Sequence, residues 1–207
     1  MTTRRGRPTN AEAKMLDHQV REAAVQTFLE HGYDGATMES IAKAAGITKR
    51  SLYARYPDKR GVFADVIPWA LSRYEDSASD PVFDDMEMEP ALLAIARLAL
   101  ERAVDPRNVR LMRIAMTESA RFPEFAGTAD SMRWSARHRA VVDVLRRGEV
   151  KGLVTVDDVE LAAEHFLAMV ELIPGRLADF GIFRSKRQED RRLKHAVRLF
   201  LRGVEPR

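Results

Sequence analysis

Apolar positions recur with the period of an α-helix along almost the whole chain after residue 10, and no convincing run alternates apolar and polar residues as a strand would. In the first such segment, residues 11–31, Val20, Ala24 and Phe28 fall on one stripe, and the following Gly32 is placed to end the helix. The later segments with this period are residues 90–104, 107–121, 128–148, 157–180 and 187–203. The pattern therefore predicts an all-α protein.

Two short helices are predicted directly after the first one. Thr37 is placed to cap a helix that ends at Gly46, although Ser40 stands where a capping box normally has Glu or Gln, so we expect the box to be incomplete. Thr48 is placed to cap a second short helix that runs through Arg55. A helix, a glycine turn and a short helix in this order are typical of a helix-turn-helix.

The remaining pattern divides the chain into four parts. We expect a basic flexible arm over residues 1–10, a three-helix helix-turn-helix domain over residues 11–57, a connecting helix over residues 58–74, and a larger helical bundle over residues 75–207 that binds a ligand and forms a dimer. Pro68 lies inside the predicted connecting helix, where a proline removes a backbone hydrogen bond and costs about 3 kcal/mol unless a kink is tolerated.

Composition narrows the function classes. The 207 residues include no cysteine, which excludes disulfides and thiolate catalysis, and no apolar run approaches the roughly 20 residues of a membrane-spanning helix. We therefore expect a cytoplasmic protein with no membrane segment. The motifs of common hydrolases, metal sites and phosphate loops are missing, and the five histidines are scattered, so we expect neither an enzyme nor a metal or other cofactor.

Charge is distributed unevenly along the chain. Eleven basic and seven acidic side chains lie between residues 1 and 60, with the basic ones concentrated at residues 4–7 and 43–60, whereas residues 75–89 carry acids and no base. Basic clusters of this kind are typical of nucleic-acid binding. An architectural DNA binder without sequence preference is an alternative, but it leaves the large second domain unexplained.

Residues 32–59, GYDGATMESIAKAAGITKRSLYARYPDK, closely resemble the DNA-binding domain of the tetracycline-repressor (TetR) family. The resemblance implies that residues at the front of the second short helix enter the major groove and that the lysine matching Lys59 contacts DNA. Because its planar fork can bond O6 and N7 of guanine together, we expect Arg50 to read a guanine. The full set of DNA-binding candidates in this stretch is Thr37, Thr48, Lys49, Arg50, Ser51, Tyr53, Arg55, Tyr56 and Lys59.

Two arguments about these candidates stay open. Lys49, Arg50 and Arg55 could instead form an ordinary solvated face, and Ala54, Arg55 and Tyr56 depart from the aromatic-His and Phe pattern common in the family. Lys59 opposes the positive end of its helix dipole, which is a poor choice for stability alone and would be justified by a nearby phosphate.

The N-terminal arm carries a second candidate contact with DNA. Arg4, Arg5 and Arg7 stand in the sequence Arg-Arg-Gly-Arg-Pro, whose Arg-Gly-Arg-Pro core looks like an AT-hook, and extended arginines suit the narrow minor groove of A·T-rich DNA. A basic tail that only increases solubility is an equal alternative.

Residues 110–125 are similar to a C-terminal domain of TetR regulators related to multidrug-efflux repressors, which implies a helical bundle with an internal pocket. Aromatic and methionine side chains make adaptable apolar cavities, although each one taken singly is more often plain core. The ligand-binding candidates are Trp69, Phe83, Arg97, Met112, Met116, Phe122, Phe125, Trp134, His138, Phe166 and Met169. Arg97 and His138 could orient a polar group of a ligand. We favour instead an ion pair at a helix edge for Arg97 and a hydrogen-bonded core or interface position for His138.

The last two predicted helices carry broad apolar faces that could pair with a second copy in a four-helix interface, as the family resemblance also implies. The candidates for this interface are Leu161, His165, Phe166, Leu193, Val197 and Phe200. Together these patterns predict a homodimeric repressor that binds palindromic double-stranded operator DNA and is released by a small-molecule inducer. An activator or a ligand-independent regulator of the same family is the alternative.

Overall fold

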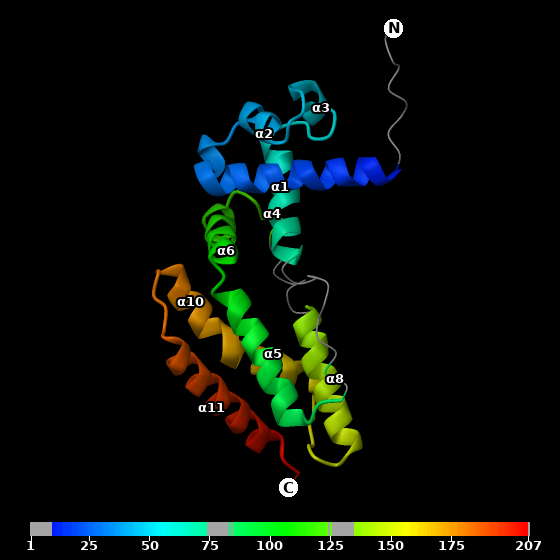
Figure 1. Ribbon diagram of the computed structural model, residues 1–207, viewed down its shortest axis with the longest axis vertical. Coiled ribbons are helices and arrows are strands. Elements are labelled where there is room, and N and C mark those ends of the chain that lie inside the picture. Colours follow the sequence, from blue (N-terminus) through cyan, green and yellow to red (C-terminus); the bar gives the residue numbers. More distant parts are fainter. Residues whose placement is uncertain (1–9, 74–82, 84, 124, 126–134, 207) are drawn as a thin grey trace. The chain divides into compact units, whose positions relative to one another are not determined.

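The computed structural model describes residues 10–73, 83, 85–123, 125 and 135–206, and all its regular elements in these ranges are helical, as the sequence pattern predicts (Figure 1). The elements are α1 (Asn10–Gly35), α2 (Met38–Ala44), α3 (Lys49–Tyr53), α4 (Lys59–Arg73), α5 (Met88–Ala103), α6 (Pro106–Glu118), α8 (Ala136–Val150), α9 (Val159–Leu167), the π-helical turn η1 (Ala168–Leu172), α10 (Ile173–Asp179) and α11 (Lys186–Val204). None of these helices is long and apolar enough to cross a membrane.

The chain forms two compact units, which we call the N-terminal unit and the C-terminal unit. The N-terminal unit comprises the chain up to Ala70 together with Ile114–Phe125, and the C-terminal unit comprises Leu71–Arg113 and the chain from Ala126 onward. The C-terminal end of α6, from Ile114, and the turn after it therefore belong with the helix-turn-helix, whereas the sequence pattern assigned them to the larger bundle.

Local signals account for the helices of the N-terminal unit. Gly32 interrupts α1 with a φ of 68°, a left-handed conformation that residues with a β-carbon resist. The capping box of α2 is complete, contrary to the sequence-based expectation, because the Ser40 hydroxyl accepts from the backbone N–H of Thr37 at 3.0 Å while the Thr37 hydroxyl accepts from the Ser40 N–H. Gly46, with a φ of 64°, makes the turn between α2 and α3.

An aromatic cluster joins the two sequence segments of the N-terminal unit. Phe63 of α4 lies edge-on to Phe28 of α1, with ring centres 4.8 Å apart, and Phe122 lies 4.7 Å from Phe63 and 5.1 Å from Tyr33. Phe125 stacks on Phe122 at 5.3 Å. Phe122 and Phe125, which the sequence suggested as ligand-pocket residues, are thus buried core of the DNA-binding unit.

In the C-terminal unit, α5 packs against α8, η1 and α11, and α8 packs against α9. Phe166 of α9 and Phe200 of α11 meet at 5.0 Å between ring centres in this core, where Leu193 and Val197 are also buried. This corrects the predicted dimer interface, because these four side chains cover one another and other helices of the same chain. The predicted candidates Leu161 and His165 remain exposed.

The helix predicted over residues 157–180 is interrupted by a π-helical turn, η1. A π turn leaves backbone carbonyls without their usual helical partners. Arg192 of α11 donates to two of them, the carbonyl oxygens of Met169, at 2.9 Å, and of Val170. The same guanidinium binds Glu189 at 2.7 Å, so the turn is held by a charged side chain from the neighbouring helix.

Candidate nucleic-acid interface

The two short helices α2 and α3 are fixed by hydroxyl caps and by one anchor from α1. The Thr48 hydroxyl accepts from the Ser51 backbone N–H at 3.1 Å and lies 2.9 Å from the Ser51 hydroxyl. The Gln19 amide of α1 donates to the carbonyl of Ala45 at 3.2 Å, at the end of α2. Leu52, fully buried, seats α3 on the core. The candidates Thr37, Thr48 and Ser51 therefore have capping roles, which are independent of any contact with DNA.

The opposite side of α3 is exposed. Tyr53 is 50% exposed, and Arg50 lies on the surface with no hydrogen-bond or ion-pair partner for its guanidinium within the part of the chain that the structure describes. An arginine on a helix front that is left without an internal partner is available to a ligand, and its five N–H donors suit the base edges of a major groove.

Lys49 has an internal partner that the sequence pattern did not indicate. Its Nζ lies 2.7 Å from Oε2 of Glu39, in the first turn of α2, and both side chains are mostly exposed. The hydrogen bond from Lys49 lowers the pKa of Glu39, and the bond from Glu39 raises the pKa of Lys49. An acid in the first turn of one helix and a base ten residues later in the next are the signals that could have suggested this pair.

The C-terminal end of α3 is held by a polar chain of five side chains, which we call the polar clamp. Arg55 binds Asp17 of α1 at 3.0 Å, Asp17 binds Arg21 at 3.3 Å, and Arg21 binds Asp65 of α4 at 3.3 Å. The Tyr56 hydroxyl closes the chain by donating to Asp65 at 2.6 Å. Burial, together with this carboxylate, raises the pKa of Tyr56 to about 12. The DNA-binding candidates Arg55 and Tyr56 thus have internal partners.

Lys59 also has partners inside the N-terminal unit. Its ammonium donates to the carbonyl oxygens of Tyr33, at 2.7 Å, and Asp34, at 3.2 Å, and lies 4.6 Å from the centre of the Tyr33 ring. This corrects the argument from the helix dipole, because the carbonyls at the end of α1 justify the lysine without a phosphate. An ammonium has three donors, so a contact of Lys59 with DNA stays a prediction.

The ligand-pocket candidates do not gather in one place. Trp69 belongs to the N-terminal unit, where the Arg21 guanidinium lies 5.5 Å from its ring and His18 meets it edge-on at 5.6 Å. Arg97 pairs with Asp190 at 3.0 Å, and the buried His138 ring lies 3.0 Å from the Glu160 carbonyl oxygen.

The other candidates are divided between core and surface. Phe83, Phe166 and the partly buried Met169 belong to the core of the C-terminal unit, Met112 is partly buried, and Met116 is exposed. Arg4, Arg5, Arg7 and Trp134 lie outside the described residues.

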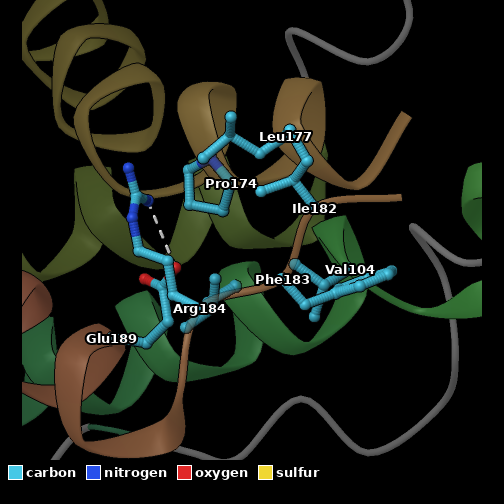
Figure 2. A pocket seen from close by; sticks show the side chains of 8 residues that line it. Val104, Pro174, Leu177, Ile182, Phe183, Arg184 and Glu189 are labelled. Carbon is cyan, nitrogen blue, oxygen red and sulfur yellow. Dashed lines mark hydrogen bonds and ion pairs between the residues drawn. The ribbon is translucent and has the colours of Figure 1, made fainter. Parts of the chain in front are cut away.

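A small half-open pocket lies in the C-terminal unit, with a volume of about 60 Å³ (Figure 2). Its apolar walls come from α5, α10 and the segment after α10, and the Arg184–Glu189 ion pair, 3.3 Å long, borders it. Ligand sites usually measure roughly 300–1,000 Å³, so this hollow alone does not hold a drug-sized molecule. None of the predicted ligand candidates that lie in the described part of the chain lines it.

Comparison with known families agrees with this arrangement. Residues 20–66 match the family described as bacterial regulatory proteins, tetR family, and residues 90–203, more than half of the chain, match the C-terminal domain of AefR-like transcriptional repressors. The chain belongs to the TetR family. It is therefore a transcriptional regulator of a family that is not enzymatic, with a DNA-binding helix-turn-helix and a C-terminal ligand domain.

Individual TetR-family proteins show the same likeness. A TetR-family regulator from Mesorhizobium loti superposes with a TM-score of 0.83 at 26% identity, covering 96% of this chain and 100% of that one. The flavonoid-responsive regulator FrrA gives a TM-score of 0.75 at 28% identity, covering 94% and 99%.

The repressor AcnR of Corynebacterium glutamicum is 30% identical over 110 residues, 53% of this chain and 50% of AcnR. The stretches shared with AcnR and four other curated relatives span 24–50% of those proteins' own lengths.

Proposed function

We propose that this TetR-family regulator is a repressor that binds a palindromic operator as a homodimer through α3 and leaves it when a small molecule binds the C-terminal unit. Repression is supported by the names of relatives such as AcnR of Corynebacterium glutamicum and BepR of Brucella suis, both called transcriptional repressors.

The observation that carries the proposal is the exposed side of α3. Arg50 and Tyr53 lie there on a helix whose opposite side is anchored by Leu52, so the groups that can reach base edges stand on a fixed support. Arg50 reads a guanine, and Lys59 uses its remaining donor on a phosphate. The arm with Arg4, Arg5 and Arg7, outside the described residues, tracks the adjacent minor groove.

A second copy of the chain supplies the other half of the reading surface. Large apolar side chains stay exposed on the α9–α10 segment and on α11, namely Leu161, Leu172, Ile173 and Leu199. An aliphatic side chain left in water forgoes about 1.5–3 kcal/mol of burial energy, so pairing of these helices with the same helices of another copy is favourable. A two-fold dimer then reads a two-fold operator.

Release by an inducer requires the two units to communicate, and α4 and α6 each have residues in both. Pro68 leaves α4 one backbone hydrogen bond short near the point where the helix passes between the units. A ligand that favours a different conformation of these helices lowers operator affinity without unfolding the protein. FrrA, which is named flavonoid-responsive, provides a precedent for a small-molecule response in a similar fold.

The deciding experiment selects bound duplexes from a random DNA pool with the full chain and then screens compounds for release of the selected duplex. We expect a near-palindromic site bound by two copies. Arg50→Ala should lose affinity for it, whereas Arg187→Ala, which removes the same charge from an exposed position on α11, should not. Selection of no sequence, or binding of one copy to an asymmetric site, would refute the proposal.

A transcription assay with the selected site upstream of a reporter decides between repression and the alternatives. Lower reporter output with the protein present, restored by the releasing compound, is the expected result. Higher output would identify an activator, and unchanged binding with every compound would favour a ligand-independent regulator.

A further inference from the structure

Glu39 places a negative charge beside the recognition helix. Lys49, Arg50 and Tyr53 present cationic and hydroxyl groups on the exposed side of α3, and the Glu39 carboxylate reaches Lys49 from α2. Its Oε2 accepts from Nζ of Lys49 at 2.7 Å, while the side chains remain 74% and 53% exposed. A carboxylate in this position repels the phosphates that a DNA-binding surface must approach, so its presence needs a reason.

Stability of the fold is a weak reason. Exposed ion pairs contribute little to stability, because water screens the charges and two long side chains must be ordered. Glu39 already interacts favourably with the amino end of the α2 dipole, and this interaction does not need Lys49. The pair does keep both groups ionised, since each one shifts the pKa of the other toward its charged form.

The order and spacing of the two charges match the major-groove edge of one kind of base pair. In a G·C pair, the O6 acceptor of guanine and the N4 donor of cytosine lie side by side, joined by a Watson–Crick hydrogen bond of about 2.9 Å. The ammonium and the carboxylate are 2.7 Å apart and present a donor beside an acceptor, the complementary order. A T·A pair presents the same order at O4 and N6, but a methyl group replaces the N7 acceptor of guanine.

We propose that Glu39 and Lys49 read one base pair in each half-site as a unit, with the ammonium on O6 and N7 of guanine and the carboxylate on N4 of the paired cytosine. The inference rests on the proposed function, the binding of operator DNA through α3. The expected preference at this position is G·C first, then T·A, and last A·T and C·G. The last two place a base donor against the ammonium and a base acceptor against the carboxylate. On DNA without this base pair, Glu39 neutralises Lys49, and the pair adds no affinity for the phosphate backbone.

The test repeats the selection from a random duplex pool with wild type, Glu39→Gln, Lys49→Met and the double variant. Affinities are then measured for the selected site with each of the four base pairs at every position. In wild type, one position per half-site should favour G·C over A·T and C·G by about tenfold or more. Glu39→Gln should reduce this preference to less than about threefold and add nothing once Lys49→Met is present, because the two residues act together.

Salt dependence gives a second readout. Glu39→Gln leaves Lys49 able to bind a phosphate, so the slope of log affinity against log salt should steepen by about 0.9 per protomer. Glu30→Gln is the matched control, because it removes the same charge from an exposed position on α1 of the same unit, and it should leave the base preference unchanged. Thermal unfolding of each variant shows that it is folded.

The possible failures are distinguishable. If wild type selects no sequence, the proposed function itself is wrong. If wild type selects a site and Arg50→Ala weakens it, but Glu39→Gln and Lys49→Met both keep the wild-type base preferences, the pair does not read a base pair and this inference alone is overturned. A preference that follows Lys49 but is unaffected by Glu39→Gln overturns it as well.

Discussion

Replacing Tyr56 by phenylalanine tests whether the polar clamp holds the N-terminal unit together. The substitution removes the hydroxyl that donates to Asp65 at 2.6 Å and leaves the ring in place. A hydrogen bond to a charged group contributes about 1.5–3 kcal/mol, but Asp65 keeps Arg21 and is partly exposed, so we expect a loss at or just below the lower bound of this range, about 1–1.5 kcal/mol. At about 2–4 °C per kcal/mol for a chain of this size, the Tm should fall by about 2–6 °C.

Alkaline pH provides the second part of this test. The pKa of Tyr56 is raised to about 12 in the folded protein, above the value near 10 of an unfolded chain. The folded state therefore holds this proton more tightly, so the stabilisation is complete below about pH 10 and is lost as the pH rises toward 12. Urea unfolding between pH 8 and 12 should show a steeper loss of stability in wild type than in Tyr56→Phe.

Tyr53→Phe is the control for both measurements, because this exposed hydroxyl has no partner in the described part of the chain. It should leave the free energy of unfolding unchanged and lower operator affinity. Equal stability of wild type and Tyr56→Phe at pH 8, or parallel pH profiles above pH 10, would show that the clamp does not stabilise the unit and would refute the reasoning.

Three further predictions concern DNA, inducer and dimer. Arg50→Ala should cost about 1–3 kcal/mol of binding free energy, mainly at one base pair, whereas Lys59→Ala should weaken binding to all DNA sequences alike and also lower the Tm. If Arg50→Ala only reduces the slope of log affinity against log salt by about 1, Arg50 is a phosphate contact. Titrations of inducer with and without operator should show each weakening the other by the same factor, and unequal factors would exclude a simple two-site linkage. Leu199→Glu should produce monomers in analytical ultracentrifugation, whereas Phe200→Ala should lower the free energy of unfolding by about 3–5 kcal/mol. A dimer that survives Leu199→Glu would place the interface elsewhere.

Local features of the sequence predicted most of the helices because their signals lie within a few residues. Thr37 and Thr48 cap the helices that follow them, and Gly46 adopts the left-handed turn its position suggested. The same reasoning missed contacts between residues far apart. Nothing near Phe122 indicates that it packs on Phe63, and the acid at Glu39 and the base at Lys49 become a pair only once the turn at Gly46 brings α2 and α3 together.

Amphipathic faces were predicted more reliably than the surfaces that cover them. The periodicity of α11 identifies Leu193, Val197 and Phe200 as one apolar face, but a helical period does not say whether that face meets the same chain or a second copy. In the structure it meets α5, α9 and η1 of the same chain. The π turn was also beyond prediction, because the carbonyls of Met169 and Val170 are satisfied by Arg192, about twenty residues later in the chain.

The placement of residues 114–125 constrains any attempt to exchange modules between regulators. A chimera cut after the connecting helix would take the helix-turn-helix without Phe122 and Phe125, and the faces of Phe63 and Tyr33 that these rings cover would be left in water. The transplanted unit would then be prone to aggregate before any operator could be tested. A viable graft has to carry two separate stretches of sequence. New DNA specificity is therefore reached more simply by substituting residues on α2 and α3 than by moving the whole N-terminal unit.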